Sequence, residues 1–346
     1  MPATESYSPR VPRRTLTDRV PSVQPERALA DLVVPPAFAA ATTGSYLPRP
    51  DEPSQADARA AVESFARSVR RPVPRRRLLR RAPAPVGAGV YLDGGFGVGK
   101  THLLAAAAHA VDSPVAFGTF VQYTALVGAL GFAATRDALA DRALVCIDEF
   151  ELDDPGDTVM VSTLLGDLAS AGVSLAATSN TLPGALGEER FAAADFAREI
   201  QGLAARFRVV HIDGPDHRHR DSAVTHTPSD PDGLARWVGA HGAVTDDFGA
   251  LLTHLGRVHP AAYGDLLDDV PAVAWRDVTP LPDQNAALRL VVLVDRLYDR
   301  GVPVAASGVP LTDVFSEDML AGGHRKKYGR ARSRLAALAG LAPPPR

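Results

Sequence analysis

Short apolar runs alternate with longer helical patterns between Val86 and Gly214. The runs typical of buried strands are VYLDG (90–94), SPVAF (113–117), ALVCIDEF (143–150), VSLAATSN (173–180) and FRVVHIDG (207–214). Helical patterns fall between them at 100–110, 121–130, 157–170 and 195–206. Buried strands separated by helices are typical of parallel sheets, so this region predicts a parallel sheet sandwiched by helices.

The pattern changes on both sides of this region. Upstream, residues 53–69 read as a helix with one apolar face, formed by Ala58, Val62, Phe65 and Val69. Downstream, a polar break at 215–233 precedes a mixture of helical patterns and strand-like runs. The helices are expected near 234–240, 246–256, 284–300 and 325–339, and the strands within 270–278 and 302–308.

These patterns divide the chain into four regions. Residues 1–30 are rich in proline, serine and arginine and predict a mostly disordered arm. Residues 31–85 hold the N-terminal helix and an Arg/Pro-rich linker, and residues 86–214 hold the α/β core. Residues 215–340 predict a C-terminal domain of mixed helical and α/β character.

Composition and charge exclude several classes of protein. The 346 residues are 46% hydrophobic with a formal net charge of -3, which disfavours a general polyanion binder. The single cysteine, Cys146, excludes an internal disulfide framework and a Cys-based zinc cluster, and we expect it to be a small apolar residue in a buried strand. No signal-like or membrane-spanning apolar run occurs, so we expect a cytoplasmic protein.

Eight arginines lie between Arg67 and Arg81, interrupted by Pro72 and Pro74. Such a charge run is typical of a solvated, extended linker. Contact with an acidic partner or with nucleic acid is the alternative.

A glycine-rich stretch follows the first strand-like run. It matches the phosphate-loop pattern G-x-x-x-x-G-K-[ST] between a strand and a helix. Its glycines let N–H groups face the phosphates, Lys100 is expected to reach the β- and γ-phosphates, and Thr101 is expected to bind Mg²⁺. The predicted nucleotide-binding residues are Gly94, Gly95, Phe96, Gly97, Val98, Gly99, Lys100, Thr101 and His102.

A second apolar run, Leu144–Ile147, ends in the carboxylates of Asp148 and Glu149. Asp148 is expected to hold Mg²⁺ through its water shell, and Glu149 to orient or deprotonate the attacking water. Such a run alone is common, but downstream of a phosphate loop it indicates hydrolysis. Lys100 and Glu149 are therefore predicted catalytic residues.

The next strand-like run closes with Thr178-Ser179-Asn180. Ligands of parallel sheets bind beyond the carboxyl ends of the strands, so Asn180 is expected to share a crevice with Asp148. There it would contact the γ-phosphate or the lytic water as a third catalytic residue. The alternative is a turn-forming Asn before Thr-Leu-Pro.

Walker A, Walker B with Asp-Glu and a sensor-like Asn at successive strand ends resemble the AAA+ ATPases. In more detail, DEFELDDPGDTVMVSTLL, VSLAATSNTLPGAL and IDGPDHRHR resemble the ZapE family of bacterial cell-division ATPases, relatives of the mitochondrial AFG-one-like ATPases. LRLVVLVDRLYDRGVPV (288–304), YGRARSRLAAL (328–338) and the early Gln55 also have counterparts in that family. The resemblance spans about residues 35–340.

The resemblance implies a P-loop NTPase core of AAA+ type and a C-terminal domain. It also implies ATP and Mg²⁺ as cofactors, remodelling of a protein partner such as FtsZ, and an ATP-dependent homo-oligomer. The chain departs from the family pattern at His217, which replaces Tyr in the triplet Asp216-His217-Arg218, and in the segment GEERFAAADFAREI after the sensor.

The arginine finger, which AAA+ rings lend to the neighbouring subunit's ATP, is assigned by position. Arg190 lies ten residues after Asn180 and is the expected finger, with Arg198 and Arg206 as alternatives. Each could equally be a solvated helix arginine. The candidates for a second sensor are Arg330 and Arg334.

Other function classes share the phosphate loop. A nucleic-acid-associated loader of the replicative-helicase type is the alternative, but the basic run before the core and the net acidic charge make nucleic acid an unexpected partner. The intact Asp148-Glu149 pair argues against a scaffold that holds ATP without turnover. The place of Asn180 and the long C-terminal domain argue against a kinase.

Overall fold

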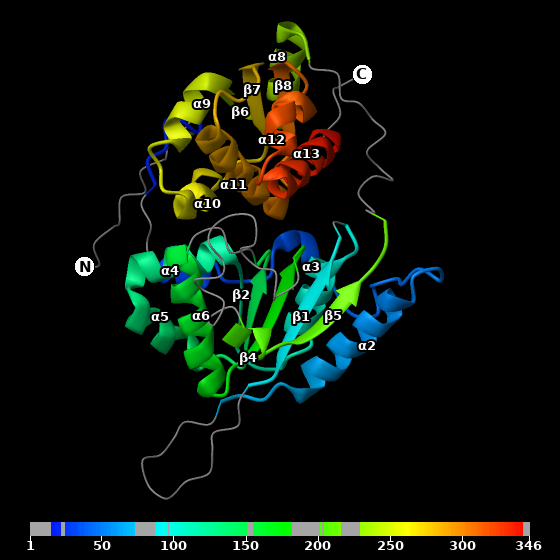
Figure 1. Cartoon of the computed structure of the whole chain (residues 1–346). Helices are drawn as coiled ribbons and strands as arrows, with labels where there is room; N and C mark the ends of the chain where they lie inside the picture. Colours follow the sequence, from blue (N-terminus) through cyan, green and yellow to red (C-terminus); the bar gives the residue numbers. More distant parts are fainter. Residues whose placement is uncertain are drawn as a thin grey trace, which may run out of the picture. The chain divides into compact units, whose positions relative to one another are not determined.

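The computed structural model describes residues 15–21, 25–72, 87–95, 97–150, 155–181, 201–202, 204–215 and 229–341. The chain divides into two compact units (Figure 1). The core unit comprises residues 23–223, and the C-terminal unit comprises residues 1–22 together with 224–346. Each unit contains a parallel sheet of its own.

Five parallel strands form the sheet of the core unit in the order β2-β3-β4-β1-β5. Strand β4 therefore lies between β1 and β3, pairing Leu92 with Thr178 and Ile147 with Ala177. The predicted parallel sheet is confirmed. Its strands are β1 (Gly89–Gly94), β2 (Val115–Thr119), β3 (Leu144–Asp148), β4 (Ser174–Ser179) and β5 (Arg208–Ile212).

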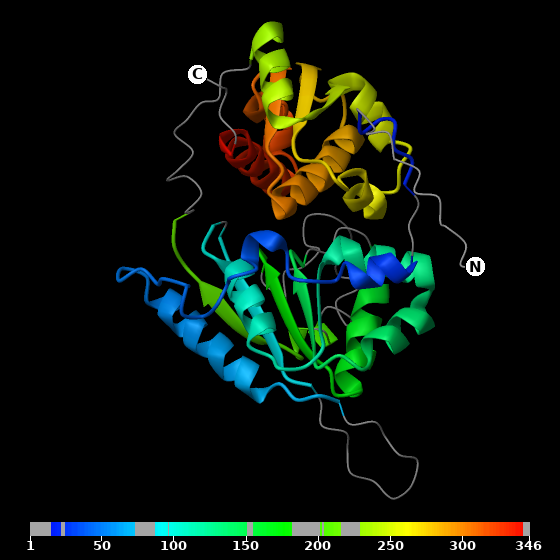
Figure 2. The same cartoon turned by 180° about the vertical axis from the view of Figure 1, so that it is seen from behind.

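Alternate residues of each strand face opposite sides of this sheet, and both sides carry buried apolar side chains. Helices therefore cover both faces. Helices α2 (Pro53–Ser68) and α3 (Lys100–His109) pack on the face of Leu92 and are seen in front of the sheet in Figure 2. The opposite face, with Tyr91, packs against the remaining helices. These are α1 (Pro25–Ala30), α4 (Phe120–Leu130), α5 (Phe132–Leu139) and α6 (Pro155–Ser170).

Ala58, Val62 and Phe65 of the predicted apolar face are buried on α2, and Val69, which directly follows the helix, is buried as well. Helix α5 was not predicted. It starts directly after Gly131, whose φ of 83° ends α4, and its one deeply buried apolar residue, Leu139, is too weak a pattern to reveal it. A short 3₁₀ helix, Pro36–Phe38, precedes α2.

The C-terminal unit has a three-stranded parallel sheet in the order β6-β7-β8. Its strands are β6 (Val244–Asp247), β7 (Val273–Val278) and β8 (Val304–Gly308). Its α-helices are α8 (Pro231–His241), α9 (Phe248–Leu255), α10 (Tyr263–Leu266), α11 (Gln284–Arg300), α12 (Glu317–Ala321) and α13 (Arg325–Gly340). The 3₁₀ helices are Pro260–Ala262 and Leu311–Asp313.

Strand β6 corrects the expected helix at 246–256. The helix starts only at Phe248, because Asp247 caps it by accepting a hydrogen bond from the Ala250 N–H at 2.8 Å. The preceding residues pair with β7 instead. In the described part of the chain, no helix has the length and apolar character needed to cross a membrane.

The expected loose arm over residues 1–30 also needs a correction. Residues 25–30 form α1, and residues 15–21 lie on the C-terminal unit, where Leu16 is fully buried. The amide of Leu16 donates to the buried carboxylate of Asp246 at 2.9 Å. A polar composition predicts disorder, but it does not reveal a specific partner of this kind.

Candidate nucleotide site

The phosphate loop runs from the end of β1 to the start of α3. Gly97 and Gly99 have φ values of 71° and 88°, in the left-handed region that favours glycine. The N-terminus of α3, the positive end of its dipole, therefore opens into the loop at Lys100. This is the arrangement predicted for a phosphate nest; Phe96 lies outside the described residues.

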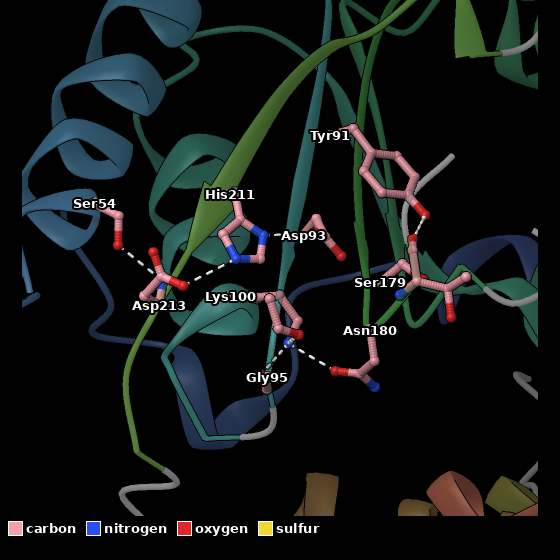
Figure 3. A network of polar contacts seen from close by, with 11 residues as sticks. Ser54, Tyr91, Asp93, Gly95, Lys100, Ser179, Asn180, His211 and Asp213 are labelled. Atoms are coloured by element: carbon pink, nitrogen blue, oxygen red, sulfur yellow. Dashed lines mark hydrogen bonds and ion pairs between the residues drawn. The ribbon is translucent and has the colours of Figure 1, made fainter. Parts of the chain in front are cut away.

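Lys100 connects the loop with the end of β4. Its ammonium donates to the carbonyls of Gly94 at 2.8 Å and Gly95 at 2.5 Å, and to Asn180 Oδ1 at 2.8 Å (Figure 3). Because β4 lies beside β1, the end of β4 carries Asn180 to the edge where the loop begins. The structure thus brings together Lys100 and Asn180, two residues that the sequence placed at one site.

Thr101 and Asp148 form an oxygen cluster beside this lysine. Thr101 Oγ1 lies 3.1 Å from both carboxylate oxygens of Asp148. Oxygen ligands suit Mg²⁺, and two adjacent ligands, each about 2.1 Å from one octahedral ion, lie about 3 Å apart. Thr101 and Asp148 would therefore suit Mg²⁺, Thr101 through its hydroxyl oxygen and Asp148 through the water shell of the ion.

Thr178 orients both members of the Asp148-Glu149 pair. Its hydroxyl donates to Asp148 Oδ1 and accepts from the Glu149 N–H at 3.0 Å. Thr178 is 1% exposed and Asp148 is 5% exposed, so bulk water has little access to compete for either hydrogen bond. This role of Thr178 was not predicted from the sequence; the available signal was a hydroxyl two residues before the sensor-like Asn180.

Glu149 has a backbone conformation that is uncommon for its residue type. Its φ is 55°, which places a non-glycine residue in the left-handed region directly after β3. The hydrogen bonds of its own N–H and of Phe150 N–H to Thr178 hold this turn. Strain of this kind is often retained at functional sites.

A second polar network starts at Asp93, the residue before the loop. Asp93 and His211 are paired across β1 and β5, and His211 Nδ1 lies 2.7 Å from Asp93 Oδ2 (Figure 3). His211 Nε2 lies 3.0 Å from Asp213 Oδ1, and the Asp213 N–H donates to Ser54 Oγ at 2.8 Å. The hydrogen bond to Asp93, and further the charges of both carboxylates, raise the pKa of His211 against a smaller opposing effect of burial.

Residues 42–55 support the loop from outside. The Tyr46 hydroxyl donates to the Val98 carbonyl at 2.9 Å, and burial raises the pKa of this hydroxyl to about 12. His102 Nε2 lies 3.0 Å from both Ser45 Oγ and the Thr42 carbonyl, so this predicted nucleotide-binding residue contacts the support. Gln55 Nε2 donates to the Asp213 carbonyl at 2.9 Å.

Arg190, Arg198 and the triplet Asp216-His217-Arg218 lie outside the described residues. Arg206 directly precedes Phe207 and β5, and its guanidinium lies against Gly166 of α6. Its role as a finger stays a prediction.

The two sensor candidates of the C-terminal unit are buried. Arg330 Nη2 donates to Asp295 Oδ2 at 2.9 Å, and Arg334 donates to Asp295 Oδ1. Burial alone would raise the pKa of Asp295, but the two guanidiniums outweigh burial and hold that pKa below its ordinary value. One ion cluster between α11 and α13 thus joins the two C-terminal segments that resemble the ZapE family, 288–304 and 328–338.

Comparison with known proteins places the chain in a family. Residues 22–237 and 234–341 match the AFG1-like ATPases. The chain belongs to the AFG1-like ATPase family. This confirms the resemblance carried by the motifs, and the phosphate loop, the Asp-Glu strand end and Asn180 all lie in the matched region.

Individual relatives agree with this assignment. The cell division protein ZapE of Escherichia coli K12 is 25% identical over 291 residues, covering 71% of this chain and 76% of ZapE, and ZapE of strain O157:H7 gives the same values. Among solved structures, DnaA domain III from Thermotoga maritima has a TM-score of 0.40 at 15% identity, covering 77% of this chain and 90% of that one. AMPPCP-bound DnaA from Aquifex aeolicus has a TM-score of 0.37 at 14% identity, covering 85% and 80%. At these TM-scores the structural likeness carries no argument about function.

Proposed function

We propose that this AFG1-like protein hydrolyses ATP with Mg²⁺ and couples the hydrolysis to the remodelling of a protein partner. The observation that supports this most is the meeting of three strand ends: Lys100 with Asn180, and Thr101 with Asp148 and its neighbour Glu149. A nucleotide clamp needs only the first part of this set. The carboxylate of Glu149 adds a base for water.

Each side chain has a defined part in this proposal. The γ-phosphoryl group of bound ATP would be transferred to water as the β–γ phosphoanhydride bond breaks, with ADP as the leaving group. Lys100 places its ammonium against the β- and γ-phosphates, and Asn180 orients that ammonium or the water. Thr101 and Asp148 hold Mg²⁺, and Glu149 Oε accepts a proton from the water.

The biological setting is proposed from the relatives. A role in cell division is suggested by the name of ZapE, the cytoplasmic location is the one expected from the sequence, and FtsZ is the partner class implied by the resemblance. We further propose that the core unit carries out hydrolysis and that the C-terminal unit engages the partner. ATP would also drive assembly of a homo-oligomer, in which Arg190 of one subunit acts on the ATP site of the neighbouring subunit.

Steady-state ATP hydrolysis by the purified full chain tests the catalytic assignment. Lys100→Ala should weaken ATP binding at least 100-fold, whereas Glu149→Gln should bind ATP and lose about 10²–10⁴ in kcat. Glu317→Gln makes the same chemical change on an exposed helix start of the C-terminal unit and should match the wild type. Turnover at the wild-type rate by Glu149→Gln would overturn the role of Glu149.

The same Glu149→Gln variant tests the partner. Loaded with ATP and used as bait, it should retain a protein that Lys100→Ala does not retain. Equal recovery with both variants would argue against ATP-dependent engagement.

A further inference from the structure

Residues 15–19 are held on the C-terminal unit by hydrogen bonds to a buried carboxylate. Asp246, at the end of β6, is 2% exposed. It accepts the Leu16 N–H at 2.9 Å, the Thr17 N–H at 3.0 Å and the Thr17 hydroxyl at 2.8 Å. Two consecutive amides and one hydroxyl therefore bind a single carboxylate.

The side chains on either side of these bonds make further contacts. Leu16 is fully buried, while Val20 is 83% exposed, which marks the end of the held segment. Arg19 Nη1 donates to the carbonyl of Leu266, the last residue of α10, at 2.9 Å and to the carbonyl of Asp268, two residues later, at 2.6 Å. His254 Nε2 lies 2.8 Å from the Arg19 carbonyl.

These contacts have the character of peptide recognition. A backbone–carboxylate pairing sets the register, one apolar side chain is buried, and a cation is bound by carbonyl oxygens. Among the described residues, the donors to Asp246 all belong to Leu16 and Thr17. Removing the segment would take every one of those donors from a buried carboxylate, which is strongly unfavourable.

The position of residues 15–19 on the C-terminal unit gives the chain a second covalent link between its two units. The match to the AFG1-like ATPases begins at residue 22, so residues 15–19 precede the family region. The chain leaves the C-terminal unit after Ser22, forms the core unit, and returns at Val224. The held segment thus turns the N-terminal end of the chain into a second link between the units.

We propose that the C-terminal unit carries a peptide-docking site and that its occupant is this chain's own segment Thr15–Arg19, bound as a separable ligand. The site selects a leucine followed by a hydroxyl residue, with an arginine two positions after the hydroxyl. The docked segment is a second, breakable connection between the units.

Cleavage of the chain between the two units tests whether the segment is a ligand. A specific protease site replaces residues 22–24 in the full-length protein, and the cut protein is passed over a sizing column. The N-terminal fragment should stay with the rest of the wild-type chain. Leu16→Ala and Thr17→Val change only the segment and should lower retention about 10- to 100-fold, the loss expected for a buried side chain or a hydroxyl bond to a charged group.

Matched substitutions test the carboxylate. Asp246→Asn should release the fragment, whereas Asp277→Asn removes an exposed carboxylate from the neighbouring strand and should retain it. Loss of the fragment from the wild type, or equal retention by Leu16→Ala and Thr17→Val, would overturn the proposal.

Hydrogen exchange on the uncut chain provides a second measurement. The amides of Leu16 and Thr17 should exchange about 10- to 100-fold more slowly in the wild type than in Thr17→Val, and Asp246→Asn should accelerate their exchange as well. If Asp246→Asn does not fold, the two segment variants still decide the outcome. Neither measurement uses ATP, so the result is independent of the proposed hydrolysis; fast exchange of both amides in the wild type would contradict docking.

Discussion

Replacing Thr178 by valine removes one hydroxyl from the centre of the site and keeps the shape of the side chain. The hydroxyl donates to Asp148 and accepts the Glu149 amide at 3.0 Å. A hydrogen bond to a charged group contributes about 1.5–3 kcal/mol, and an amide left without its acceptor costs about 1–3 kcal/mol. Since Thr178 is 1% exposed, water cannot readily replace either bond.

We expect two separable effects of Thr178→Val. The free energy of unfolding should fall by about 2.5–6 kcal/mol, measured by urea titration. If about 1.4–2.8 kcal/mol of this support acts in the transition state, kcat for ATP falls about 10- to 100-fold. The KM for ATP should change far less, because Lys100 is held by Gly94, Gly95 and Asn180.

Thr178→Ser is the matched control, since it keeps the hydroxyl and loses a methyl group. It should cost about 1 kcal/mol of stability and leave kcat within a few-fold of the wild type. A Thr178→Val protein with wild-type kcat would refute the argument that this hydroxyl positions the Asp148-Glu149 pair. Equal losses in both variants would show that the methyl group, not the hydroxyl, matters.

Three further predictions follow from other parts of the molecule. Gly99→Ala should weaken ATP binding at least tenfold and lower the Tm, because the φ of Gly99 is 88° and an added Cβ would lie 2.5 Å from Tyr46 Cε2. Gly128→Ala is the control: among the described residues no atom lies within 4 Å of its added Cβ, so this variant should stabilise the protein by about 0.5–1 kcal/mol. Similar changes in ATP binding and Tm in both variants would contradict the close approach of Gly99 to Tyr46. The fold raises the pKa of His211 above 6.5, so the stabilisation that protonated His211 contributes is complete below that pH and is lost as pH rises through the folded-state pKa. The Tm of the wild type should therefore fall over that pH window relative to the Tm of His211→Gln. Parallel pH profiles of the two Tm values would be evidence against this contribution. Asp295→Asn takes the carboxylate from two buried arginines and should cost about 3–5 kcal/mol in urea unfolding, a loss below 1 kcal/mol being inconsistent with the cluster.

The sequence predicted the parts of the site that sit directly at strand ends. Lys100, Asp148 and Asn180 each follow a buried run, and buried parallel strands end on the same edge of a sheet. Chain-local signals are enough for this, because apolar periodicity and glycine spacing are properties of short windows.

The order of the strands in the sheet, in contrast, could not be predicted from short windows of sequence. The facing of Asp93 and His211 depends on β1 pairing with β5, and the contact of Lys100 with Asn180 depends on β4 entering between β1 and β3. Strand order is decided by the packing of whole layers, so no window of sequence carries it. Strand β6 was missed for a related reason: its burial comes from its neighbours, while its residues, VTDD, lack a β-rich pattern.

The order β2-β3-β4-β1-β5 has a consequence for how this protein is made. Among the described strands, β1 pairs with β4 and β5, and about 80 positions separate Gly94 from Ser174. At about 5–20 residues per second, a ribosome needs roughly 4–16 s to cover that distance. The glycine-rich loop is thus synthesised early and acquires its rigid base late, whereas β2 and β3 are close in sequence and can pair first. Nascent chains paused before residue 174 should hold a β2-β3 pair and an unpartnered loop, which makes the delay between these strands the interval in which chaperones matter most.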